Sequence, residues 1–233
     1  MKISLFGIQG IPLGKHNVKD PRLDQADKLV EAQKKTCAQV DVVEDKEMIT
    51  ADAVLTTRAA LSDLLVKDLD AVETRLSRNP SDAEKAVLQK LADGLISEKP
   101  VSAAGLAADE IAVISAHNFY SNRPVVVASE AELAAPDALI VRAFRESGYI
   151  SFLTVGGKEN RAWPICKGTT AWEAGGVIHS DIQKGFIRAE IMAVDDLLRL
   201  GSEREVKAAN LYHTVGKDHV MRDGDEIVVR FSV

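Results

Sequence analysis

The sequence predicts an α/β protein followed by a small α+β module, with an antiparallel helical hairpin inserted into the α/β part. Two apolar stripes at helical spacing lie in the middle of the chain. Short apolar strands alternate with helical segments up to residue 148. After that point the strand-like runs are separated by Gly-Gly, Lys-Gly and Asp-Gly turns, which are typical of a sheet with tight connections. We therefore expect two domains, residues 1–148 and 149–233.

The composition excludes several classes of protein. The chain has 233 residues, of which 46% are hydrophobic and 27% charged, so it is neither disordered nor fibrous. The net charge of −6 argues against a basic nucleic-acid sleeve. Two cysteines are too few for a disulfide framework or a zinc cluster, which favours a reducing cytoplasm. No apolar run reaches the ~18–20 residues of a membrane span, so no membrane partner is expected.

The N-terminal part begins as a short α/β unit. Lys2–Gly7 reads as a buried strand that runs into a turn rich in glycine. Asp24–Lys34 has apolar residues at near-helical spacing, and Gln39–Val43 resembles a second strand. This order of strand, turn, helix and strand favours a small parallel sheet.

The middle of the chain predicts a helical hairpin at about residues 49–100. The first apolar stripe runs at steps of four, four, three and four through Leu61, Leu65, Leu69, Val72 and Leu76. Asn79-Pro80 breaks that helix, and Ser81 with Glu84 has the pattern of a capping box. The second stripe contains Val87, Leu88, Leu91 and Leu95. Residues 41–110 carry a net charge of −7, so the acidic excess belongs mainly to the hairpin and its flanks.

The remaining elements follow the same patterns. Helices are expected at Ala107–His117, Asp137–Glu146, Asp195–Leu200 and Glu203–Asn210. Strands are expected at Pro124–Ala128, Tyr149–Val155, Arg161–Ile165, Arg188–Met192 and Glu226–Val233.

The turn after the first strand partly matches a phosphate-binding loop. Such a loop needs four residues between its glycines, then a lysine for the phosphate oxygens and a Ser or Thr for magnesium. Here Gly10 and Gly14 are separated by three residues, and Lys15 is followed by His16. Asp41 resembles a metal-side aspartate at the end of the next strand, but a carboxylate stands three residues later where a glycine is needed. On these residues alone, an ordinary glycine-rich turn is the simpler interpretation.

A second candidate site is a stretch of basic residues interleaved with Trp163, Trp172 and Phe186. Bases stack on aromatic rings and phosphates pair with cations, so such a stretch suits RNA. A mixed sheet with ordinary solvent-exposed charges would contain much the same residues, so both interpretations stay open. The candidate residues for RNA or partner binding are Lys158, Arg161, Lys167, His179, Lys184 and Arg188.

No catalytic or metal site is expected from the sequence. His117, His179, His213 and His219 do not have a metal-ligand spacing, and no cysteine lies near them in the sequence. No serine elbow, carboxylate pair or Cys/His signature is present.

The C-terminal third contains a nearly continuous series of distinctive runs. They are Tyr149–Trp163, Gly168–Ala171, Gly176–Asp181, Gly185–Glu190, Gly216–Asp218 and Asp223–Asp225. Together these runs resemble the YchF subfamily of Obg-like ATPases. Lys2–Lys15, Asp20–Leu23 and the hairpin resemble the phosphate-loop strand, a following segment and the coiled-coil insert of the same family. The resemblance implies a reduced P-loop-type core and a C-terminal β-grasp (TGS) domain, ribosome association, and ATP or GTP with magnesium as ligand.

The departures from the family pattern favour a shortened form with a degenerate nucleotide domain. Only 25 residues separate Lys15 from Asp41, which leaves no room for the family's switch region. We therefore expect a non-catalytic protein that binds RNA, the ribosome or a translation-associated partner, with Gly10, Gly14, Lys15 and Asp41 as a vestigial nucleotide site. The alternatives are a slow nucleoside triphosphatase with a non-standard loop and a sensor of a small ligand through the TGS module.

Overall fold

The computed structural model describes residues 1–232, which form two compact units. The N-terminal unit contains residues 1–16 and 40–147, and the C-terminal unit contains residues 17–39 and 148–233. The sequence predicts a single domain over residues 1–148. The structure differs because residues 17–39 pack with the C-terminal residues. Parallel and antiparallel strands are both present, which agrees with the mixed α/β prediction.

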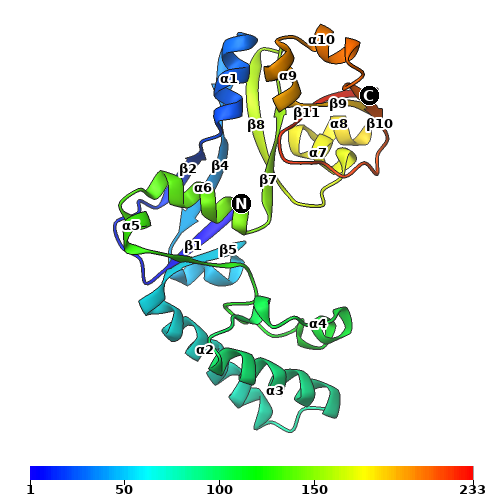
Figure 1. Ribbon diagram of the computed structural model, residues 1–233. Helices are drawn as coiled ribbons and strands as arrows, with labels where there is room; N and C mark the ends of the chain where they lie inside the picture. The colour runs from blue at the N-terminus through cyan, green and yellow to red at the C-terminus, as the bar shows by residue number, and fades with distance from the viewer. Residues whose placement is uncertain (233) are drawn as a thin grey trace. The chain divides into compact units, whose positions relative to one another are not determined.

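A five-stranded sheet in the order β2-β4-β1-β5-β6 lies at the centre of the N-terminal unit (Figure 1). Its strands are β1 (Lys2–Phe6), β2 (Gly14–Val18), β4 (Ala38–Val43), β5 (Ala53–Thr57) and β6 (Val125–Ala128). The pairs β1–β4, β1–β5 and β5–β6 are parallel. The division between the two units falls within β2 and β4.

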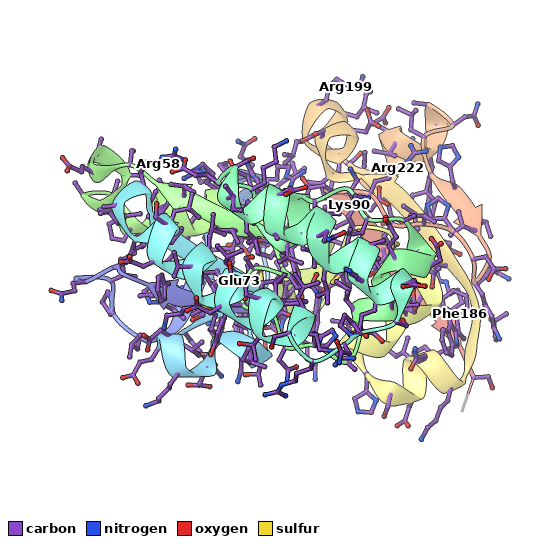
Figure 2. All side chains as sticks on the ribbon, turned by 90° about the horizontal axis from the view of Figure 1, so that it is seen from below. Arg58, Glu73, Lys90, Phe186, Arg199 and Arg222 are labelled. Carbon is purple, nitrogen blue, oxygen red and sulfur yellow. The ribbon has the colours of Figure 1, made fainter. Side chains whose placement is uncertain are left out.

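The helices of this unit include the predicted hairpin. α2 (Arg58–Leu76) and α3 (Asp82–Ile96) run side by side, and their apolar stripes form one buried cluster (Figure 1). Charged residues such as Glu73 and Lys90 lie on the outer surface of these helices (Figure 2). The other helices are α4 (Ala108–Ile114), α5 (Glu130–Leu133) and α6 (Pro136–Glu146), with 3₁₀ helices at Asp45–Thr50 and Val101–Ala103.

The start of the hairpin needs a correction. Residues 53–57, which the sequence analysis included in it, form the central strand β5, and α2 begins only at Arg58. Val54 and Leu55 are fully buried, and β5 pairs with strands on both sides, so tertiary pairing decides its conformation. The Ser81 cap is present, because its hydroxyl accepts the N–H of Glu84. The Glu84 carboxylate binds Arg75 at 2.6 Å instead of reaching back to Ser81.

The C-terminal unit is built on a six-stranded sheet in the order β10-β9-β11-β7-β8-β3. Its strands are β3 (Lys34–Thr36), β7 (Tyr149–Thr154), β8 (Glu159–Cys166), β9 (Phe186–Ala193), β10 (His213–Val215) and β11 (Asp225–Phe231). Its helices are α1 (Pro21–Leu29), α7 (Ala171–Ile178), α8 (Ser180–Lys184), α9 (Val194–Leu200) and α10 (Glu203–Ala208). Neighbours β11 and β7 are parallel, whereas β7–β8 and β9–β11 are antiparallel.

The two faces of this sheet have separate cores. α7 contributes Ala171 and Ala174 to the cluster that contains Phe152 and Ile165. Met192 lies on the other face, because it alternates with Ile191 along β9, and it packs against Leu197 of α9 and Val206 of α10.

Residues 17–39 form a strap that completes the C-terminal unit. β3 pairs in parallel with β8 at the edge of the sheet, in the register Lys34↔Glu159 to Thr36↔Arg161. Asn160 is fully buried, and its side-chain amide donates to Asp27 and to the carbonyl of Val30 at 2.8 and 2.6 Å. These contacts join segments that are more than 100 residues apart in the sequence.

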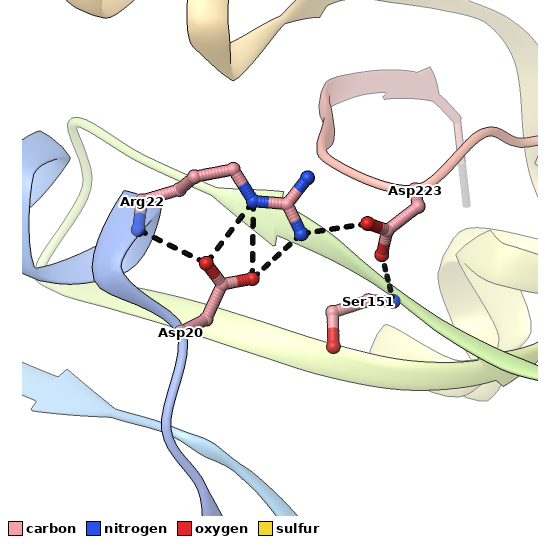
Figure 3. A network of polar contacts seen from close by, with 4 residues as sticks. All are labelled: Asp20, Arg22, Ser151 and Asp223. Carbon is pink, nitrogen blue, oxygen red and sulfur yellow. Dashed lines mark hydrogen bonds and ion pairs between the residues drawn. The ribbon is translucent and has the colours of Figure 1, made fainter. Parts of the chain in front are cut away.

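An ion-pair network ties the start of the strap to the loop before β11 (Figure 3). The guanidinium of Arg22 lies 2.7 Å from Asp20 and 2.9 Å from Asp223, whose other oxygen accepts the N–H of Ser151 at 3.0 Å. The Asp20 carboxylate, together with that of Asp223, raises the pKa of Arg22 above its usual range. A Cβ on Gly224, whose φ is +83°, would collide with this guanidinium, so glycine is needed there for both reasons.

Candidate functional site

The glycine-rich loop after β1 lies beside a candidate binding pocket. Gly7 and Gly10 have φ values of +67° and +87°, which glycine adopts without strain. The loop and residues Glu44 and Asp45, which follow β4, line a hollow of about 770 Å³. It lies at the carboxyl ends of the parallel strands β1 and β4, where open α/β sheets ordinarily bind ligands.

The chain beyond this loop continues as a strand and not as a helix. Gly14 and Lys15 are the first two residues of β2, and the Lys15 side chain is exposed. Asp41 pairs in register with Lys2 at the beginning of β1, two residues before the end of β4. Within residues 1–232, the pocket lining therefore contains Gly10 but none of Gly14, Lys15 and Asp41.

The charge of the pocket is unfavourable for a phosphate. Both ionisable lining residues are acids, Glu44 and Asp45, and no lysine or arginine of the described chain lines the hollow. Lys46 lies outside the lining and pairs with Glu44 at 2.5 Å, a contact that raises the pKa of Lys46. The ring Nε2 of His16, at the magnesium-hydroxyl position of the motif, lies 2.6 Å from the carbonyl oxygen of Pro12. These donors do not fit the chemistry by which a P-loop holds a magnesium triphosphate.

The six basic candidates do not gather on one surface of the C-terminal unit. Across the paired strands, one face of the sheet carries Ala162, Leu153, Glu226 and Met192. Arg161 is next to Ala162 along β8, so its side chain lies on the opposite face. Arg188 is four residues before Met192 along β9, so these two side chains lie on the same face of the sheet. Arg161 and Arg188 therefore lie on opposite faces.

The surroundings of the six residues also differ. Lys158, Lys167 and Lys184 are exposed, and His179 caps α8 by accepting the N–H of Asp181. The guanidinium of Arg161 lies 3.8 Å from the centre of the Trp163 ring, so this cation is already in contact with an aromatic face. Only part of the set is therefore free to meet a phosphate.

Arg188 has a basic neighbour that is not evident from the sequence. Arg230 of β11 is directly opposite Arg188 of β9, and both lie near the carboxylate of Glu190, at 2.8 and 3.9 Å. Arg230 lowers the pKa of Glu190. The strand registers, which the sequence does not reveal, were needed to place these two arginines together.

Among residues 1–232, no three His, Cys, Asp or Glu side chains lie close enough together to hold a metal ion. In the same range, every helix is too short or too polar to span a lipid bilayer.

Comparison with known proteins shows a similarity to YchF proteins. Residues 149–232 match the model of the YchF GTPase C-terminal family, described as a protein of unknown function (DUF933). The ribosome-binding ATPase YchF of Bacillus subtilis is 26% identical over 260 aligned residues, which cover 84% of this chain and 68% of that protein. Residues 149–232 therefore match the YchF C-terminal family, and the chain as a whole is similar to YchF proteins of the Obg-like ATPases. The YchF GTPase structure from Schizosaccharomyces pombe has the same fold, with a TM-score of 0.79 at 19% identity, over 99% of this chain and 97% of that one.

Other relatives match over a shorter stretch of the chain. The ribosome-binding ATPase YchF of Haemophilus ducreyi is 42% identical over 95 residues, or 40% of this chain and 26% of that protein. The Obg-like ATPase 1 of Oryza sativa is 45% identical over 95 residues, or 41% of this chain and 24% of that protein. These matches span about a quarter of each relative.

Proposed function

We propose that this YchF-like chain binds the ribosome through its C-terminal unit, which we interpret as a TGS-type β-grasp module, and through the helical hairpin. We further propose that it does not hydrolyse nucleotide. The absence of hydrolysis is supported by the loop after β1. This loop is followed by the strand β2 instead of a helix, and it lines a pocket that contains two carboxylates. Ribosome association is supported by the names of the relatives from B. subtilis and H. ducreyi. It implies a cytoplasmic location.

The negative charge of the pocket opposes the binding of a triphosphate. Two like charges ~4 Å apart near a protein surface repel by about 4 kcal/mol. A P-loop offsets the phosphate charge with backbone N–H groups at a helix start and with a lysine. In this chain the segment after the loop is a strand, and Lys15 lies outside the pocket lining. A phosphate placed there meets Glu44 and Asp45 without those compensating groups.

The ribosome part of the proposal predicts a salt-dependent interaction that depends on exposed cations. Lys184→Ala combined with Arg188→Ala is expected to weaken binding to ribosomes by about tenfold or more, and to reduce the slope of log K against log salt by about 1.5. Co-sedimentation with ribosomes at several salt concentrations measures both quantities.

The matched control removes the same charge from the N-terminal unit. Lys46→Ala combined with Arg145→Ala alters two exposed residues outside the hairpin. This pair is expected to leave the slope unchanged. Equal effects of the two double variants, or binding that does not vary with salt, would contradict the assignment of the contact to the C-terminal unit.

A second candidate function is weak binding and slow hydrolysis of ATP or GTP. It is favoured by the hollow of about 770 Å³ at the carboxyl ends of β1 and β4, and by relatives that are named ATPases or GTPases. Under this alternative the loop glycines would bind phosphate with their N–H groups, and Lys15 would have to move to the pocket.

A further inference from the structure

A second hollow, of about 460 Å³, lies within the C-terminal unit and is lined by residues of β9, β10 and α9 and by the segment that leads into β11. Ile191 is opposite His213 of the edge strand β10, so these side chains share a face. Leu211 and Val215 supply further apolar lining. The volume is within the range of small-molecule sites, which are typically apolar hollows with a few convergent polar groups.

The buried carboxylate of Asp225 is the main polar group of this hollow. Asp225 is only 6% exposed, and its Oδ2 accepts the backbone N–H of Arg222 at 2.8 Å. No ion pair to Asp225 is present in the described part of the chain. Burial raises the pKa of Asp225, although the charges of His219 and Arg222 act in the opposite direction. A carboxylate with so little solvent gains strongly from a cationic hydrogen-bond donor.

The other polar groups favour a cation over an anion. The lining contains two carboxylates, Asp196 and Asp225, and one guanidinium, Arg222, so with neutral histidines its formal charge is −1. Asp196 itself is paired with Arg199 at 2.6 Å, which leaves Asp225 as the carboxylate in need of a partner. A metal ion does not fit, because no three ligating side chains converge anywhere in residues 1–232.

We propose that this pocket binds a small organic cation, an ammonium or guanidinium group on a hydrocarbon stem, with its charged head on Asp225. The stem lies against Ile191, Leu211 and Val215. The imidazoles of His213 and His219 line the same hollow and accept hydrogen bonds from the head group when they are neutral. This site is separate from the proposed ribosome contact and does not depend on it.

The test is a titration of the ¹⁵N-labelled full chain with butylguanidinium and with its neutral analogue butylurea. Butylguanidinium is expected to shift the amides of residues 191–193, 213–219 and 222–225 to saturation. Butylurea is expected to bind at least about tenfold more weakly, because it has the same shape without the charge. Equal shifts from both compounds, or no saturable shift from butylguanidinium, would overturn the proposal.

Two variants assign the binding to this pocket. Asp225→Asn keeps an acceptor for the Arg222 N–H and is expected to lose at least about tenfold in affinity for butylguanidinium. His213→Lys places a competing cation at the rim of the hollow without changing Asp225, and is also expected to abolish binding. The matched control is Thr214→Lys, which adds the same charge on the opposite face of β10 and is expected to bind normally. Unaltered binding in both His213→Lys and Asp225→Asn would place the site elsewhere.

Discussion

Replacing Asp68 by alanine is expected to destabilise the N-terminal unit by about 3–5 kcal/mol. Asp68 projects from α2 and is fully buried. Its carboxylate accepts the N–H of Tyr120 at 2.6 Å, and the N–H and hydroxyl of Ser121 at 2.7 and 2.6 Å. The variant leaves these donors buried without an acceptor, so the cost includes their desolvation as well as the lost bonds.

The measurement uses hydrogen exchange of the N-terminal unit and tryptophan fluorescence of the other. Both tryptophans of the chain, Trp163 and Trp172, belong to the C-terminal unit and report on its urea unfolding. Asp68→Ala is expected to lower protection of the peptides around α2 and Tyr120 while the tryptophan transition stays in place. The control Asp70→Ala changes an exposed carboxylate on the same helix and is expected to be nearly neutral. Comparable loss of protection in the two variants would contradict the account.

The second large effect is expected at Glu226, a buried acid in β11. It is 2% exposed, and its Oε2 has no hydrogen-bond partner within residues 1–232. Burial raises its pKa from 4.5 to about 8, with the charge of Glu203 acting in the same direction. The folded state therefore keeps a proton that the unfolded state has released between these two pH values.

Because unfolding then releases a proton, rising pH favours unfolding. The stabilising contribution of protonated Glu226 is fully present below about pH 4.5 and is lost as the pH rises to about 8. The free energy of unfolding of the C-terminal unit is expected to fall over this window by about 3–5 kcal/mol from this group.

Glu226→Gln isolates this contribution from the other titrating groups. The variant is expected to be less sensitive to pH than the parent chain and more stable than it at pH 8, as measured by urea unfolding followed through tryptophan fluorescence. The control is Glu205→Gln, an exposed carboxylate on α10, which is expected to keep the pH dependence of the parent. If the parent and Glu226→Gln have parallel stability curves, Glu226 is ionised in the folded protein and the interpretation is wrong.

The hairpin is the part of the fold that the sequence predicts best. Its signal is local, since Leu61, Leu65 and Val72 repeat at helical spacing and Ser81 marks the next helix start. The strands β2, β3, β5 and β10 were not predicted, because they are short and lack alternation. β3, with the sequence Lys-Lys-Thr, is a strand only through its pairing with β8, more than 100 residues away.

The same reason limits prediction of the sites. Arg22 meets Asp223 across 201 residues, and Arg188 meets Arg230 through a register that the sequence does not reveal. The hollow around Asp225 likewise combines β9, β10 and the start of β11. The glycine-rich turn was visible in the sequence, but its continuation into β2 in place of a helix required the structure.

The most direct test of the proposed loss of nucleotide chemistry is calorimetry with ATP and GTP, with and without magnesium. The pocket carboxylates Glu44 and Asp45 and the strand at Gly14–Lys15 predict no saturable binding tighter than about 1 mM for either nucleotide. They also predict that Lys15→Ala leaves the titration unchanged. Micromolar binding that requires magnesium and is abolished by Lys15→Ala would contradict the account and favour the alternative in which the loop binds a nucleoside triphosphate.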